Sequence, residues 1–185
     1  MGERDHLLDL IEDLEQQAEG IHLADRDAEV ADRVRAEYAR VPLTSRVHAS
    51  VGHRVSVCVS GVGVLDGNVE RAGRDWFALE VAPAGATWVV RLDAVRTATG
   101  LSERSLVEEA RPAVARLGLG SVLRRLSEAG ESVTVHHQDG TRTAGRLARV
   151  GEDFVELAPD VSSVRETWGR VTLVTFAGLA AVSAR

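Results

Sequence analysis

The chain has 185 residues, and its net charge of −6 arises entirely within residues 1–50, which hold 12 Asp or Glu and 6 Arg. A single cysteine, Cys58, excludes an internal disulfide framework and a cysteine-based metal cluster. No apolar run approaches the roughly 20 residues of a membrane span, and the acidic N-terminus lacks the pattern of a secretory signal, so we expect a cytoplasmic protein with no membrane partner.

The acidic N-terminal segment, residues 1–43, has the periodicity of two amphipathic helices, the second of which ends at Pro42. The apolar stripes of the two helices contain Leu7, Leu10, Ile11, Leu14, Val30 and Val34. Helices without a core of their own must bury such stripes on another surface. The pattern fits a hairpin that covers the rest of the protein, and it fits equally a coiled coil or bundle through which copies of the chain associate.

The remainder of the chain contains an internal repeat at an offset of 78 residues. Valines of β-strand pattern and several glycines recur in one register, and the motif Arg-x-Gly-x-Asp-aromatic occupies residues 71–76 and 149–154. Gly100-Leu101 and Gly178-Leu179 extend the match at the end of each copy. We infer an internal duplication.

Each copy is predicted to form about five short, bent strands after a short helix. Apolar and polar residues alternate in both copies, and Gly67 and Gly145 lie inside strand patterns, where glycine permits a sharp bend. Ser121 is the expected N-cap of the helix before the second copy. The predicted fold is α+β, with the N-terminal helical hairpin followed by two five-stranded barrels. The barrels are expected at residues 44–102 and 121–185, joined by a helical linker over 103–120.

The second copy resembles the first sequence motif of Sm-like proteins. A helix and a glycine lead to alternating valines, an Asp-Gly turn, an interior strand glycine and an aromatic-apolar strand, all within residues 123–157. The segment 171–182 lies where the shorter second Sm motif would be. The resemblance covers roughly residues 44–102 and 121–182, and the whole chain also resembles an uncharacterised group of actinobacterial proteins. It implies SH3-like small barrels that associate through their strand edges and contact RNA through one loop.

The loop with the Asp-aromatic pair is where the resemblance places RNA contacts. The candidate nucleic-acid contacts are Arg71, Asp75, Trp76, Arg149, Asp153 and Phe154, together with Arg124, Arg125 and Arg146 of the second copy. Neither loop contains the Asn of Sm-like proteins, and the Arg-Gly pair of the second motif has no match. An aspartate after a glycine is also typical of a turn, and an aromatic residue entering a strand is typical of a core.

No residue pattern indicates catalysis, a metal or a cofactor. His136 and His137 are neighbours on a predicted strand and therefore point to opposite faces, so the two side chains cannot chelate one ion together. Cys58 lies in a strand pattern with no histidine and carboxylate marked as its partners. We therefore expect a protein that is not an enzyme and holds no cofactor.

Two functions remain open. The first is a non-catalytic scaffold or regulatory protein that self-associates through its N-terminal helices and barrel edges, with a second copy or another protein as its partner. The alternative is a regulator that binds RNA or single-stranded nucleic acid. Buried aromatic residues and arginines paired with carboxylates would favour the first, whereas a continuous arginine-lined groove beside Trp76 and Phe154 would favour the second.

Overall fold

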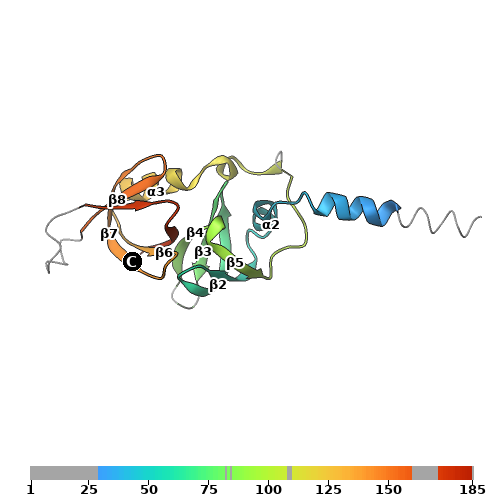
Figure 1. Cartoon of the computed structure of the whole chain (residues 1–185), viewed down its shortest axis with the longest axis horizontal. Coiled ribbons are helices and arrows are strands. Elements are labelled where there is room, and N and C mark those ends of the chain that lie inside the picture. The colour runs from blue at the N-terminus through green and yellow to red at the C-terminus, as the bar shows by residue number, and fades with distance from the viewer. Residues whose placement is uncertain (1–28, 82, 84, 108–109, 160–170, 185) are drawn as a thin grey trace, which may run out of the picture. The chain divides into compact units, whose positions relative to one another are not determined.

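The computed structural model describes residues 29–81, 83, 85–107, 110–159 and 171–184 (Figure 1). A helix covers residues 29–38 and belongs to a unit of its own, residues 1–41. Residues 42–185 form a second compact unit, which contains both copies of the repeat. The predicted association residues Leu7, Leu10, Ile11 and Leu14 lie outside the described residues.

Strands are the main regular elements of the second unit. Among its described residues, the helices with defined bounds are α2 (Leu43–Ala49) and α3 (Leu119–Ala129), together with the short 3-10 helices η1 (Leu92–Ala94) and η3 (Ala113–Arg116). The strands of the first copy are β1 (Arg54–Val59), β2 (Gly63–Ala72), β3 (Trp76–Val81), β4 (Ala86–Arg91) and β5 (Val95–Thr99). Those of the second copy are β6 (Ser132–His137), β7 (Arg142–Val150), β8 (Phe154–Ala158), β9 (Thr172–Thr175) and β10 (Leu179–Ala184).

These ten strands form one continuous antiparallel sheet in the order β5-β1-β2-β3-β4-β10-β6-β7-β8-β9. The prediction of a helical hairpin followed by two five-stranded barrels is therefore wrong. Strand β4 of the first copy pairs with β10 of the second, and no pairing within the described residues joins the edge strands β5 and β9, so the sheet is not closed. The physical reason is that β4 and β10 would otherwise each expose a row of unpaired backbone groups, which pairing with each other satisfies.

The two sets of five strands have the same internal register. At the offset of 78, the pair Val55–Gly67 of β1 and β2 corresponds to Val133–Gly145 of β6 and β7. The pairings β2–β3 and β7–β8 also correspond at this offset, including a register irregularity at matching positions. Each copy therefore builds its first three strands in the same way.

The offset changes after the third strand of each copy. Trp76 pairs with Arg91, whereas its counterpart Phe154 pairs with Thr175, so the fourth strands are 84 residues apart. The second copy is thus six residues longer between β8 and β9 than the first is between β3 and β4. The predicted match of Gly100 with Gly178 is therefore wrong, because Gly100 follows β5 and Gly178 precedes β10.

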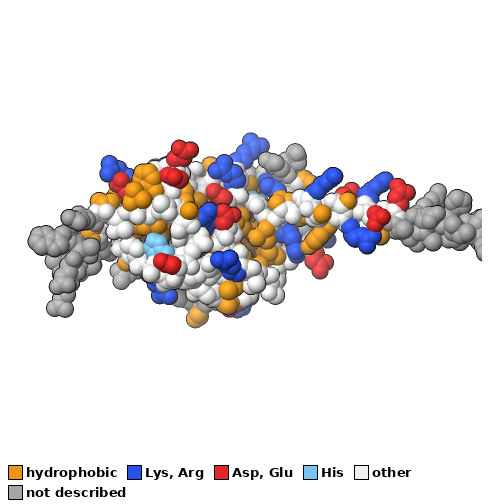
Figure 2. Space-filling model, in the orientation of Figure 1, with side chains coloured by type: hydrophobic (Ala, Val, Ile, Leu, Met, Phe, Trp, Pro, Cys, Tyr) orange, Lys and Arg blue, Asp and Glu red, His pale blue; other side chains and the backbone are white. Residues whose placement is uncertain are grey.

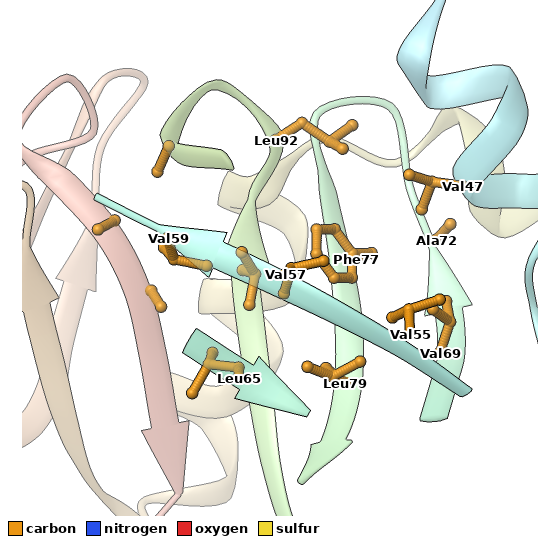
Figure 3. Packing of buried hydrophobic residues seen from close by; sticks show 14 residues of the cluster. Val47, Val55, Val57, Val59, Leu65, Val69, Ala72, Phe77, Leu79 and Leu92 are labelled. Carbon is orange, nitrogen blue, oxygen red and sulfur yellow. The ribbon is translucent and has the colours of Figure 1, made fainter. Parts of the chain in front are cut away.

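Two hydrophobic cores lie along the sheet, and each contains residues from both copies. The first core is built around Val57, Phe77 and Leu79, whose side chains point into the same interior in Figure 3, and it includes Ala180 and Ala181 of β10. The second core is built around Leu123 of α3 with apolar residues of β6 to β9. Its members from the first copy are Trp76, Ala78 and Val89. The junction of β4 with β10 therefore completes both cores.

Candidate functional site

The turn formed by the repeated Arg-x-Gly-x-Asp-aromatic motif has the same geometry in both copies. The Gly73 amide donates to the Trp76 carbonyl at 2.8 Å, and the Gly151 amide donates to the Phe154 carbonyl at 2.9 Å. The carbonyl of the intervening aspartate accepts a hydrogen bond from the residue that follows the fourth strand in each copy. The shared part of the motif is therefore a backbone device that ties the turn to the sheet.

The glycine of this turn leaves room for the aromatic ring. A Cβ placed on Gly73 would lie 2.1 Å from Nε1 of Trp76 and 2.6 Å from the carbonyl oxygen of Leu117. A Cβ on Gly151 would lie 2.5 Å from the ring of Phe154. Because no real Cβ approaches other heavy atoms this closely, a side chain at Gly73 would collide with the Leu117 backbone, whereas one at Gly151 would require the Phe154 ring to move.

The two aromatic residues predicted to stack on bases have different surroundings. Trp76 is only 3% exposed, and its Nε1 donates a hydrogen bond of 2.9 Å to the Leu117 carbonyl of the linker. The same carbonyl accepts from the Arg74 amide at 3.0 Å, so the linker is fastened over the turn. Phe154 is half-buried. Trp76 is therefore a core residue with no face open to a base.

Asp75 stabilises the start of α3. Its Oδ1 accepts a hydrogen bond of 2.7 Å from the Leu119 amide, 44 residues along the chain. The N-cap residue is Gly118, which has no side chain, so the prediction of Ser121 as N-cap is wrong. The carboxylate of Asp153 makes no hydrogen bond to the described residues, so the equivalent aspartates serve different roles.

The predicted arginine contacts do not gather in one place. Arg149 pairs with Glu156 at 2.6 Å and Arg125 with Glu128 at 3.1 Å, whereas Arg71 and Arg146 are exposed on β2 and β7. On the face shown in Figure 2, arginines lie among acidic residues without forming a continuous patch. Arg124 lines a groove with Asp75 at the start of α3.

The sequence reasoning missed two further arginines of this groove. Arg74 and Arg116 line it, and the first of them directly precedes Asp75 in the chain. The signal that could have revealed the groove is the Gly-Leu-Gly run at residues 118–120, which leaves a stretch of backbone without bulky side chains beside charged residues. No local pattern places Arg74 beside a segment more than 40 residues away.

The side chains of the outer edge strands β5 and β9 are more exposed than those of the equivalent strands at the junction, β10 and β4. Strand β9 corresponds to β4, yet Leu173 on β9 is 55% exposed while its counterpart Val89 is 6% exposed. Strand β5 corresponds to β10 and carries exposed side chains at three of its five positions, whereas β10 is buried from its first residue to its fifth. The free edges therefore expose surface that the junction covers.

The described part of the N-terminal unit also exposes an apolar stripe. Val30 and Val34, which the sequence assigns to self-association, are 62% and 59% exposed, and Tyr38 continues the stripe one turn further. The helix carries an ion pair of Arg33 with Glu29 at 3.3 Å. Val30 and Val34 are therefore exposed to solvent within the described part of this unit.

A buried histidine lies at the junction. Nε2 of His136 contacts Oγ of Ser183 at 3.2 Å, and its ring lies 4.5 Å from that of Trp88 on β4. Burial, with smaller contributions from the nearby charge of Arg142 and from His137, lowers the pKa of His136 to about 4. The side chain is therefore neutral at pH 7, and its Nδ1 has no hydrogen-bond partner among the residues that the structure describes.

Metal binding, membrane spanning and similarity to known proteins give no assignment for the described part of the chain. Among the residues that the structure describes, no group of three or more His, Cys, Asp or Glu side chains could hold a metal ion. None of the helices described there has the length and apolar character that crossing a membrane demands. No protein-family model matches the chain, and no match is found among the curated proteins. A functional assignment therefore has to come from the geometry of the fold.

Proposed function

We propose that the protein is a non-catalytic cytoplasmic scaffold that self-associates head to tail through the free edges β9 and β5. The observation that supports this proposal is the β4–β10 junction, in which the counterpart of β9 pairs with the counterpart of β5. A β9–β5 contact between two copies would give Leu173 the buried environment that Val89 has at the junction. It would also satisfy the backbone groups of both edges that have no partner among the described residues.

The internal junction predicts the register of this contact. Val90, Val89 and Trp88 lie opposite Ala181, Val182 and Ser183. Transfer to the corresponding strands places Val174, Leu173 and Thr172 of one copy opposite Thr97, Ala98 and Thr99 of the next. Such a contact joins two different surfaces, so repeated association produces either a closed ring or a filament with one free edge at each end.

The exposed stripe of the N-terminal helix provides a second surface for association. Val30, Val34 and Tyr38 recur at intervals of four residues, which is the spacing of one apolar helix face. An amphipathic helix gains stability in water when its apolar face is covered. We infer that pairing of these helices between copies reinforces the contact between sheet edges.

Self-association is favoured over nucleic-acid binding for two reasons. Trp76 is buried in the second core, so it offers no stacking surface. Arg125 and Arg149 are paired with carboxylates, which reduces the positive charge available to a phosphate backbone. The affinity of a protein for nucleic acid depends on many unpaired basic side chains that lie along the path of the phosphate backbone.

Light scattering of the purified chain tests the proposal. We expect a mass of several chains at about 100 µM, and a lower mass for Leu173→Asp, because a charge at this position prevents burial against a second copy. Val30→Glu with Val34→Glu is expected to lower the mass independently, with Ala31→Glu as the matched control on another face of the helix. A wild-type chain that remains monomeric at this concentration would refute the scaffold.

Cysteine cross-linking tests the register. In a background in which Cys58 is replaced by Ser, Leu173→Cys with Ala98→Cys is expected to give covalent oligomers on mild oxidation, because directly opposed Cβ atoms lie about 5 Å apart. The control pair, Leu173→Cys with Thr97→Cys, places the second thiol on the other face of β5 and should cross-link far less. Equal cross-linking of both pairs would disprove the transferred register.

A further inference from the structure

A groove with a volume of about 630 Å³ lies where the linker and α3 meet the turns of both copies. The β2–β3 turn contributes Arg74 and Asp75, the β7–β8 turn contributes Glu152, and Phe176 comes from the connection between β9 and β10. The self-association proposed above makes no use of this groove.

Three arginines line the groove. Arg74, Arg116 and Arg124 are all exposed, and none forms an ion pair with another residue in the described part of the chain. The neighbouring Arg125, by contrast, is held by Glu128 on the surface of α3. The groove therefore concentrates guanidinium groups whose charge is not neutralised by a paired carboxylate.

Two glycines bring these groups together. A Cβ on Gly118 would lie 2.9 Å from Nη2 of Arg74. A Cβ on Gly120 would lie 3.5 Å both from Nη2 of Arg124 and from Cε2 of Phe176. Arg74, Arg124 and the ring of Phe176 thus lie against bare backbone at the start of α3, and Arg116 lines the same groove.

Phosphate is the group that suits this chemistry. A guanidinium offers a planar fork of donors that matches the oxygens of a phosphate, and unpaired arginines provide the charge-assisted hydrogen bonds that hold it. The start of α3 contributes little by itself, since Asp75 already accepts the hydrogen bond of the Leu119 amide. The half-buried ring of Phe176 provides an apolar wall for the rest of a ligand.

The arrangement favours a small ligand over a nucleic-acid strand. Outside the groove, Arg149 of the candidate nucleic-acid set is paired with Glu156, and Arg71 and Arg146 lie on different strands. These arginines therefore do not extend the groove into a continuous basic surface. Residues 51–185 hold 16 arginines and 16 acidic residues and carry no net charge. A groove of this volume has the size of small-molecule sites.

We propose that this groove binds a small phosphate ester. The phosphate contacts Arg74, Arg116 and Arg124, and the apolar part of the ligand rests against Phe176. Asp75 and Glu152 line the same groove and oppose the negative charge of the ligand. The site is a binding function separate from self-association, and it unites elements of both copies.

Calorimetric titration with phenyl phosphate, inorganic phosphate and benzyl alcohol tests the site. We expect phenyl phosphate to bind with a Kd below about 1 mM, inorganic phosphate more weakly, and benzyl alcohol not at all. Arg124→Gln should weaken the binding of phenyl phosphate about tenfold, since it removes a charged donor. The matched control is Arg125→Gln, the next residue on the same helix, which should change Kd less than about twofold. Absence of heat from phenyl phosphate at 10 mM, or equal losses in the two variants, would overturn the proposal.

A gain of affinity and a length series complete the test. Glu152→Gln should tighten the binding of phenyl phosphate by about threefold, because it removes one of the two carboxylates that line the groove. An octanucleotide of uridine is expected to bind no more than about tenfold more tightly than phenyl phosphate. An affinity for the octanucleotide a hundredfold higher than that for phenyl phosphate would show that the groove binds a nucleic-acid strand and would overturn the small-ligand proposal. Circular dichroism confirms that each variant is folded.

Discussion

Strands β4 and β9 occupy the same position in the two copies, yet they have opposite environments. At the junction, Val89 packs in the core that the second copy provides, whereas Leu173 at the edge is mostly exposed. Both residues lie on a fourth strand that pairs with its own third strand in the same register. The comparison shows that burial of this position depends on whether another copy of the repeat lies beside it.

The partner strands β10 and β5 show the same contrast in their side chains. Ala180 and Ala181 of β10 are small enough to pack in the core of the first copy. The counterpart of Ala180 on β5 is Arg96, which reaches the hydroxyl of Ser60 at 3.0 Å. A charged residue on a free edge discourages pairing with arbitrary strands, so β5 is protected in a way that β10 does not need.

The largest expected effect comes from placing a charge at the two equivalent positions. Val89→Asp should lower the free energy of unfolding by about 4 kcal/mol, because it buries an unpaired carboxylate between the two copies. Leu173→Asp should change it by less than about 0.5 kcal/mol, because water solvates the carboxylate at the edge. Urea unfolding followed by circular dichroism, at a concentration at which the chain is monomeric, measures both. Similar losses in the two variants would mean that the edge is already covered within one chain.

The next effect concerns the pH dependence of stability. His136 on β6, beside the junction strand β10, is equivalent in the repeat to Cys58 on β1, beside the edge strand β5. Because the pKa of His136 is lowered from 6.5 to about 4, the unfolded chain binds more protons than the folded chain between these values. The contribution of neutral His136 to the free energy of unfolding is fully present above pH 6.5. It is lost as the pH falls toward 4, by up to about 3 kcal/mol.

His136→Cys, which installs the residue of the other copy, should remove this part of the pH dependence. The groups that face the imidazole are Arg142, His137, Ser183 and Trp88, and all of them remain in the variant. Urea midpoints at pH 7, 5.5 and 4.5 for both chains measure the difference. If the two chains lose stability in parallel, the titration of His136 does not contribute at the junction.

The smallest expected effect distinguishes the two aromatic turns. Gly73→Ala should cost about 2 kcal/mol, since the new methyl meets both the fixed indole of Trp76 and the backbone carbonyl of Leu117. Gly151→Ala should cost about 1 kcal/mol or less, because the methyl meets only the half-buried ring of Phe154, which can rotate away. Thermal unfolding measured on both variants tests the order. A larger loss for Gly151→Ala would contradict the assignment of Trp76 as the fixed partner.

Much of the local structure could be predicted from the sequence. Alternation of apolar residues located β1 and β6, and the repeat of Gly73 and Gly151 before an aspartate and an aromatic residue identified the turn that both copies share. The glycine that follows the helix in the Sm-like pattern is Gly130, which ends α3 in a left-handed conformation with φ of 69°. These features depend on a few neighbouring residues, whose backbone preferences act at short range.

The candidate site was less predictable, because its parts are distant in the chain. Asp75 has the sequence of a turn residue, but its carboxylate caps α3. The indole of Trp76 donates a hydrogen bond to the Leu117 carbonyl of the linker, and Arg74 and Arg124 line the same groove. None of these contacts has a signal in the residues around it, since each depends on where the linker crosses the sheet.

The sequence by itself determined that the chain contains two copies of one five-strand unit, through glycines and valines that recur in register. Only the tertiary structure decided how the units combine. A strand edge does not specify in its own residues which edge it will pair with, because backbone donors and acceptors are the same on every strand. The pairing of β4 with β10 depends on both copies being folded and adjacent, and it is this pairing that buries Val89, encloses His136 and leaves β5 and β9 free.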